Sequence, residues 1–173
     1  MAHTTWLHVA LVVILLVASA FDLIERRIPN RLLAIGLLTA VALHLASGYP
    51  ITLLTSCLAG FTVGLMMFLP LYLIGGMAAG DVKLMATVGA FVGPQLAFYS
   101  SLATYCAGGV LALAIVLLTR RARPALLHSS VLLLSLLLPK SGRPAGPTAS
   151  VGSMPYAVAI MAGTLLVLWQ QHS

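Results

Sequence analysis

Long apolar runs separated by short polar turns are the feature that most constrains this chain. Of its 173 residues, 61% are hydrophobic and only 7% are charged. Several of the apolar runs approach the ~20 residues that a helix needs to cross a bilayer. The chain is therefore expected to be an all-α polytopic membrane protein, with residues 1–173 forming a single membrane-embedded domain.

Apolar runs and turn residues divide the chain into five expected membrane-spanning helices and two shorter segments. The five helices are expected over residues 6–24, 32–46, 51–74, 95–119 and 154–169. One short segment covers residues 75–91. A helix from Asp81 to the breaker Gly93-Pro94 would extend only about 16 Å, so this segment either begins near Gly75 as a short span or is a half-span buried in protein. The other, 124–138, is interfacial, re-entrant or spanning, and a flexible Gly/Pro/Ser-rich loop follows it at 139–153.

The positive charges indicate how the chain is oriented. The formal net charge of +6 comes mainly from arginine clusters at residues 26–31 and 120–123, which flank apolar runs and contain no interleaved aromatic residues. Topology explains such clusters better than nucleic-acid binding does. The first apolar run, ending in Ala18-Ser19-Ala20, could also be read as a cleaved signal peptide, but no Lys or Arg precedes it. We therefore expect an uncleaved first span with the N-terminus outside.

The cysteines and histidines show no metal-binding pattern. Cys57 and Cys106 lie far apart in apolar stretches, without a CxxC pair or a His/Cys cluster, and the five histidines are scattered. Structural zinc requires a clustered ligand set. We expect no metal and no other cofactor.

The three acidic residues are Asp22, Glu25 and Asp81, and two of them are candidates for chemistry. Counting spans places Asp22 and Asp81 at inner helix ends on the same side of the membrane. An ionisable group within a span costs about 2.5–3.5 kcal/mol and normally faces a bundle interior or a water-filled cavity. Two carboxyls that share a proton can activate a water for attack on an amide carbonyl and protonate the leaving nitrogen. The pair is therefore a candidate catalytic dyad.

Simpler roles are also open for these residues. Asp81 could cap the helix that follows it, and Asp22 could reach the membrane interface and pair with Arg26. Lys83 is expected at the interface, although it could favour the ionised form of Asp81. A different class of function is also open: a small proton-coupled transporter, or a non-catalytic assembly subunit in which the acids relay protons or lock helices together.

Three motifs occur in order along the chain: Asp22 followed by Ile28-Pro29-Asn30, then Ala79-Gly80-Asp81-Val82-Lys83-Leu84, then Met154-Pro155-Tyr156-Ala157. With these motifs the chain resembles the type IV prepilin peptidase family, membrane aspartyl proteases with a GxGD motif, over about residues 6–169. The resemblance implies that Asp22 and Asp81 are catalytic. It also implies a part in the motif or the site geometry for Pro29, Asn30, Gly76, Ala78, Gly80, Lys83, Pro155 and Tyr156.

Ala78 stands where the family usually has glycine, giving AAGD in place of GxGD. Alanine disfavours positive φ, so a left-handed conformation at this position would strain or rearrange the site. Because Gly75 and Gly76 still precede it, we expect activity to survive the change.

The resemblance is to the minimal members associated with Flp-type, tight-adherence pili, so no N-terminal methyltransferase region is expected. It implies an aspartic endopeptidase that removes the leader of prepilins or pseudopilins at the cytoplasmic face of the bacterial inner membrane. The implied partners are the prepilin or pseudopilin substrate, membrane lipid and a pilus or secretion assembly machinery. Nucleic acid is not among them.

Overall fold

The computed structural model describes residues 2–46, 48, 50–119 and 156–172, and these residues form helices and short turns without strands. The predictions for 124–138, for 139–153 and for Pro155 lie outside the described residues. The elements are α1 (Ala2–Glu25), α2 (Asn30–Ala46), α3 (Pro50–Thr52), the π-helical segment η1 (Leu53–Leu58), α4 (Ala59–Leu73), α5 (Ala79–Val92), α6 (Pro94–Thr119) and α8 (Tyr156–His172). The expected all-α class is confirmed for this part of the chain.

The predicted number of spanning helices is not confirmed. Within the described ranges, three helical segments are long and apolar enough to cross a membrane: Thr5–Glu25, Thr55–Leu73 and Pro94–Ala114. The apolar helices at Asn30–Ala46 and Tyr156–Gln171 are shorter than these three segments. Helices are present at all five predicted positions, but only three of these positions contain a helical segment that is long and apolar enough to cross a membrane.

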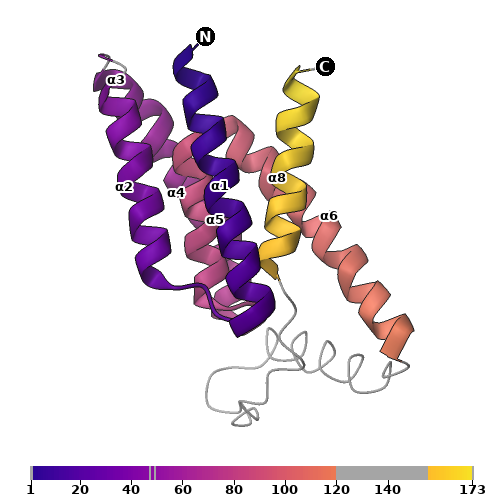
Figure 1. The fold of residues 1–173 in the computed structure, drawn as a ribbon. Helices are drawn as coiled ribbons and strands as arrows, with labels where there is room; N and C mark the ends of the chain where they lie inside the picture. Colours follow the sequence, from indigo (N-terminus) through magenta and orange to yellow (C-terminus); the bar gives the residue numbers. More distant parts are fainter. Residues whose placement is uncertain (1, 47, 49, 120–155, 173) are drawn as a thin grey trace.

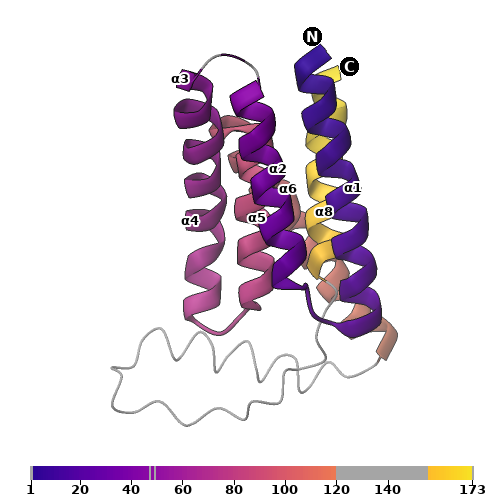
Figure 2. The same cartoon turned by 60° about the vertical axis from the view of Figure 1, so that its left-hand side comes forward.

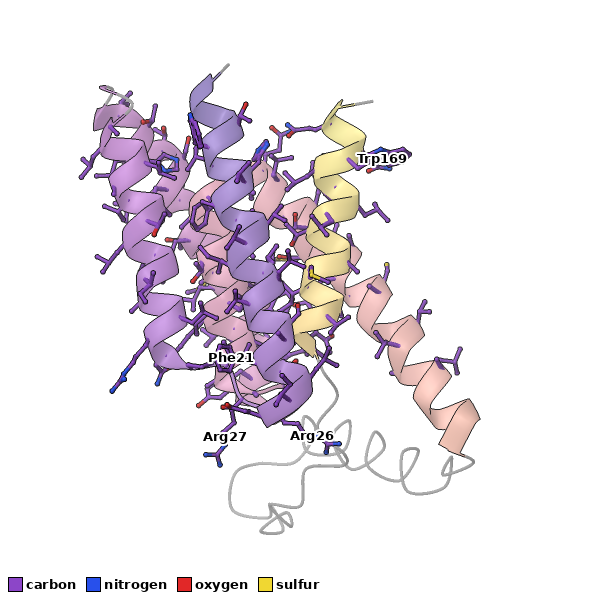
Figure 3. All side chains as sticks on the ribbon, in the orientation of Figure 1. Phe21, Arg26, Arg27 and Trp169 are labelled. Carbon is purple, nitrogen blue, oxygen red and sulfur yellow. The ribbon has the colours of Figure 1, made fainter. Side chains whose placement is uncertain are left out.

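The two ends of the bundle differ in character. Arg26 and Arg27 lie at one end, beside the turn after α1, and Trp169 lies at the opposite end and points away from α8 (Figure 3). Trp169 is 70% exposed, as expected for an aromatic residue that anchors a helix at a membrane interface. Arginines at one end and an interfacial aromatic at the other fit a bundle that is oriented along the membrane normal.

Helix α5 is the buried centre of the fold. It packs against α1, α2, α4, α6 and α8 and runs among them in both views (Figures 1 and 2). From Asp81 to Phe91 every residue is buried except Lys83. The helix has 14 residues, which corresponds to about 21 Å. The segment is buried in protein, and its helix begins at Ala79; the alternative of a helix that begins near Gly75 is wrong.

Glycines allow α4 and α5 to touch backbone to backbone. A Cβ added to Gly60 would collide with the carbonyl group of Gly89, and a Cβ added to Gly64 would lie 3.0 Å from the carbonyl carbon of Met85. Small residues at four-residue spacing permit this kind of close approach between membrane helices. The contact fixes the height of α5 against α4. The helix then ends at Gly93, whose φ of +83° is a conformation that glycine adopts readily.

Candidate active site

The two candidate aspartates lie at the same end of the bundle. Asp22 is in the last turn of α1 and Asp81 is in the first turn of α5, and these helix ends face the same side (Figures 1 and 2). The first turn of α8 begins at this end as well. Each aspartate is 7% exposed, although both lie close to helix termini. Three segments far apart in sequence thus meet around two buried carboxyls.

Asp22 binds the start of α8. Its Oδ2 accepts a hydrogen bond of 2.9 Å from the backbone N–H of Ala157, the second residue of that helix. One turn earlier on α1, the hydroxyl of Ser19 donates to the carbonyl oxygen of Ala157 at 3.3 Å. The contact of Asp22 with Arg26 runs through the backbone, where the Arg26 N–H donates to the Asp22 carbonyl oxygen at 3.1 Å. The side chain of Asp22 is therefore turned inward to α8 and holds its first turn.

Asp81 is the third residue of α5, and its position differs from the predicted helix cap. The cap residue is Ala78, and the backbone N–H of Ala78 hydrogen-bonds to the Asp81 carboxyl group. An acid at this position commonly reaches back to the start of its own helix. Asp81 thus stabilises the start of α5 from within its first turn. Its side chain is more deeply buried than a helix-capping residue at the protein surface needs to be.

Electrostatics couple the two aspartates. Helix α5 is not among the segments that could cross a membrane, so Asp81 lies outside those segments. Burial and, next, the negative charge of Asp22 raise the pKa of Asp81 from 3.8 to about 7, against the opposing effect of the Ala78 hydrogen bond. A like charge has this effect only at short range, because solvent and salt screen distant charges. The structure therefore places Asp22 within electrostatic range of Asp81.

The loop between α1 and α2 lies on the start of α5. The Nζ of Lys83 donates to the Oδ1 of Asn30 at 3.1 Å, and the side chain of Ile28 packs beside Gly80, where an added Cβ would be 3.5 Å from the Ile28 Cβ. Lys83 is exposed, and its amine is directed to Asn30. Asn30 is the first residue of α2 and uses its side chain for this contact. Pro29, just before it, accepts the backbone N–H of Leu32 at 3.0 Å and so starts α2.

The backbone conformation of Ala78 shows that alanine in place of the usual glycine causes no strain at this position. Ala78 has φ −79° and ψ 149°, an extended conformation that alanine adopts freely. The left-handed conformation occurs at Gly75, with φ +78°, and the N–H of Gly76 bonds to the carbonyl oxygen of Leu71 at 2.8 Å to close the end of α4. The possible strain at Ala78 is therefore not found, because the turn places positive φ three residues earlier.

An aromatic cluster borders the carboxyls, and sequence reasoning did not identify it. Phe68 of α4 stacks on Tyr105 of α6 with ring centroids 4.9 Å apart, and it meets Tyr156 of α8 edge-on at 6.5 Å. The Tyr105 hydroxyl donates to the carbonyl oxygen of Met67. Tyr156 lies within electrostatic range of Asp81. Tyr156 was predicted to contribute to the site geometry, but no sequence signal connects it to Phe68 and Tyr105.

Ser19 and the N–H of Ala157 were also missed as parts of the site. Ser19 precedes Asp22 by three residues, which places both on one face of α1, and this spacing was the available signal. Within the described ranges, no three His, Cys, Asp or Glu side chains gather in a way that could hold a metal ion. The chemistry that the described residues can perform is acid–base chemistry by two neighbouring carboxyls.

Buried paired carboxyls in an apolar helical bundle define a class of membrane protein that can carry out acid–base hydrolysis. The model of the type IV leader peptidase family matches residues 9–113, which include Asp22, the loop after α1 and all of α5. No curated protein and no solved structure matches the chain. The chain belongs to the type IV leader peptidase family. At the level of the family it is a multi-pass membrane protease whose substrates are prepilins.

Proposed function

We propose that this chain is an aspartic endopeptidase that cleaves the leader peptide of Flp-type prepilins or pseudopilins at the cytoplasmic face of the bacterial inner membrane, with Asp22 and Asp81 as its catalytic residues. The observation that carries the proposal is the pair of buried carboxyls at one end of the bundle, each 7% exposed and electrostatically coupled. Both lie in the segment that matches the leader peptidase family.

The pair supports hydrolysis without a covalent enzyme intermediate. Two close carboxyls do not both ionise easily, so one retains a proton while the other is a base. A water between them loses a proton to the carboxylate as its oxygen adds to the scissile carbonyl carbon, and the acid protonates the carbonyl oxygen. When the C–N bond breaks, a carboxyl group supplies the proton that the leaving nitrogen needs. Burial of Asp22 and Asp81 strengthens these interactions by excluding bulk water.

The charge distribution supports cleavage on the cytoplasmic side. Arg26 and Arg27 lie at the same end of the bundle as the last turn of α1, which carries Asp22 (Figure 3). Arginine-rich loops are retained in the cytoplasm by the positive-inside rule. Because both carboxyls lie in terminal turns of their helices, a leader peptide at the membrane surface would reach them without crossing the bilayer.

The direct test is processing of a co-expressed Flp-type prepilin in membranes that contain this protein. Asp22→Asn and Asp81→Asn should each abolish processing while the protein still accumulates. Glu25→Gln is the matched control, because Glu25 is an exposed acid in the same turn of α1 as Asp22, and this variant should process normally.

Near-normal processing by either aspartate variant would refute the assignment. Proton flux in liposomes that depends on both acids, together with no processing of any prepilin, would instead favour a transporter.

A further inference from the structure

The aromatic cluster beside the carboxyls contains two tyrosines whose hydroxyl groups differ. The hydroxyl of Tyr105 donates to the carbonyl oxygen of Met67. Within the described part of the chain, no group forms a hydrogen bond with the hydroxyl of Tyr156. Polar groups inside a packed cluster normally have a partner. An unpaired hydroxyl beside two buried carboxyls therefore suggests a bond that forms only when a substrate is present.

We propose that the hydroxyl of Tyr156 is a catalytic group that donates a hydrogen bond to the carbonyl oxygen of the scissile peptide bond, and that Gly108 of α6 is the residue that positions it. The proposal rests on the proposed function, because it needs a peptide substrate at the two carboxyls. It gives a chemical role to the first residue of α8, which lies outside the segment that matches the leader peptidase family.

The packing of α4 against α5 places the aromatic cluster beside Asp81. A Cβ added to Gly64 would meet the carbonyl group of Met85, so these two residues lie at the same level. The two helices run in opposite directions (Figure 2). One turn further along both helices, Phe68 is therefore level with Asp81. Phe68 is fully buried, and its ring meets the ring of Tyr156 edge-on at 6.5 Å.

The main chain of Tyr156 is held beside the other carboxyl. The peptide bond that follows Tyr156 supplies the N–H of Ala157, which donates to Oδ2 of Asp22 at 2.9 Å. Tyr156 thus has Asp22 next to its backbone, while its ring contacts Phe68, which is level with Asp81. The negative charge of Asp81 also acts on the Tyr156 hydroxyl, which agrees with this placement. The side chain therefore lies at the carboxyl pair.

Gly108 leaves room for the hydroxyl end of the ring. A Cβ added to Gly108 would lie 2.7 Å from the hydroxyl oxygen of Tyr156 and 2.9 Å from the ring carbon that carries it. Moving α6 away from α8 would also open the contact one turn earlier, where a Cβ on Gly163 would lie 2.6 Å from the backbone nitrogen of Thr104. A side chain at position 108 would therefore displace the hydroxyl.

The hydroxyl is accessible enough to meet a peptide. Among the described residues, the unpaired hydroxyls that are completely enclosed are those of Ser100 and Thr164, and Tyr156 is only partly buried. A carbonyl oxygen has two lone pairs, so it can accept from a protonated carboxyl and from Tyr156 at once. Negative charge develops on this oxygen as water adds, so a donor held in place stabilises the transition state more than the ground state. Tyr156 keeps its proton, and the proton transfers remain those of the two carboxyls.

The first test deletes one oxygen atom. Tyr156→Phe removes the hydroxyl and keeps the ring, and the assay is cleavage of a synthetic prepilin peptide by the full-length protein. The kcat should fall by about 100-fold, the loss that follows removal of an oxyanion donor, while KM changes by less than about twofold. Thermal unfolding should be unchanged, because the hydroxyl has no internal hydrogen bond to lose within the described residues.

Two other tyrosines provide matched comparisons for this deletion. Tyr99→Phe removes the hydroxyl of an exposed tyrosine near the start of α6 and should alter neither cleavage nor unfolding. Tyr105→Phe removes a hydroxyl that donates to the carbonyl oxygen of Met67, so it should lower the unfolding temperature. The effect on kcat without an effect on unfolding is therefore expected at Tyr156.

The second test identifies the carbonyl group. A prepilin peptide with a thioamide at the scissile bond carries sulfur, a weak hydrogen-bond acceptor, in place of the carbonyl oxygen. Tyr156→Phe should slow cleavage of this peptide far less than cleavage of the ordinary peptide, because the hydrogen bond in question is already weakened. Equal slowing of the two peptides would place the hydroxyl at another atom and would overturn the assignment.

Gly108→Ala tests whether the glycine positions the hydroxyl. It should lower kcat by about 10-fold in the otherwise unmodified protein. Combined with Tyr156→Phe it should have no further effect, because no hydroxyl remains to be displaced. The matched control is Gly109→Ala, since a Cβ there meets no atom within 4 Å. Losses that add in the double variant would show that Gly108 acts independently of the hydroxyl and would refute its positioning role.

The remaining outcomes of the first test also decide the question. A near-normal kcat in Tyr156→Phe would overturn the catalytic role, and so would a lower kcat accompanied by a lower unfolding temperature, which would mark the hydroxyl as structural. A higher KM at unchanged kcat would show uniform binding and would overturn it as well. In each case, processing by the unmodified protein leaves the proposed function intact. Failure of the unmodified protein to process any prepilin would remove the proposed function itself.

Discussion

Substituting Gly64 by alanine tests whether the contact between α4 and α5 sets the position of Asp81. A Cβ at Gly64 would lie 3.0 Å from the carbonyl carbon of Met85 and 3.1 Å from the Cα of Ala86, both closer than an ordinary van der Waals contact. These are backbone atoms, so no side-chain rotation relieves the overlap. Helix α5 must therefore move away from α4 by several tenths of an ångström.

The effect of this movement on catalysis follows from the geometry. Met85 is one helical turn from Asp81, so a shift of α5 at Met85 carries Asp81 with it relative to Asp22. A misplacement of about 1 Å can cost 10²-fold in rate, so a shift of several tenths should cost about 10-fold or more in prepilin cleavage. Overpacking at a close helix contact should also lower the free energy of unfolding by about 1–3 kcal/mol.

Gly109→Ala is the matched control for Gly64→Ala. Gly109 is also in a helix, α6, but an added Cβ there meets no atom within 4 Å. This control should retain full cleavage and should gain about 0.5–1 kcal/mol of stability from its higher helix propensity. The assays are cleavage of a co-expressed prepilin and thermal unfolding in detergent. Equal behaviour of the two variants would refute the argument that the α4–α5 contact positions Asp81.

Three further predictions concern the site itself. The proposed mechanism needs one protonated and one ionised carboxyl, and the pKa of Asp81 is raised to about 7, so the cleavage rate should fall as pH rises through neutrality and the last carboxyl proton is lost. The rate should also fall in acid, as the remaining carboxylate is protonated. A rate that stays constant well above neutral pH would contradict this prediction. Lys83→Met and Asn30→Ala should each slow cleavage a few-fold, because each removes the same hydrogen bond. The double variant should therefore be no slower than the slower single variant, and losses that add in this double-mutant cycle would show that the two residues act independently. Ala78→Gly should not increase the cleavage rate, because φ at this position is already −79°, and a clear gain in a processing assay would show that the present backbone limits the enzyme.

The agreement between sequence and structure is closest where the information is local. Apolar run lengths and turn residues located the helices, and the breaker Gly93-Pro94 correctly marked the end of α5 and the start of α6. The paired motifs around Asp22 and Asp81 predicted the family, and the count of helices predicted that both acids lie at the same end of the bundle. These properties depend on hydrophobicity, backbone preference and residue order, which can be read along the chain.

Other properties were decided by packing between distant segments. Helix α5 is buried because, among other contacts, Gly60 and Gly64 let it approach α4 closely, and hydropathy alone did not predict this contact. The hydrogen bond from Ala157 to Asp22 joins residues 135 positions apart, and the bond from Lys83 to Asn30 joins residues 53 apart. No pattern of spacing encodes such contacts, because they depend on how whole helices dock and on which way each side chain then points. The acids were visible in the sequence, but the burial and the contacts that surround them exist only in the folded bundle.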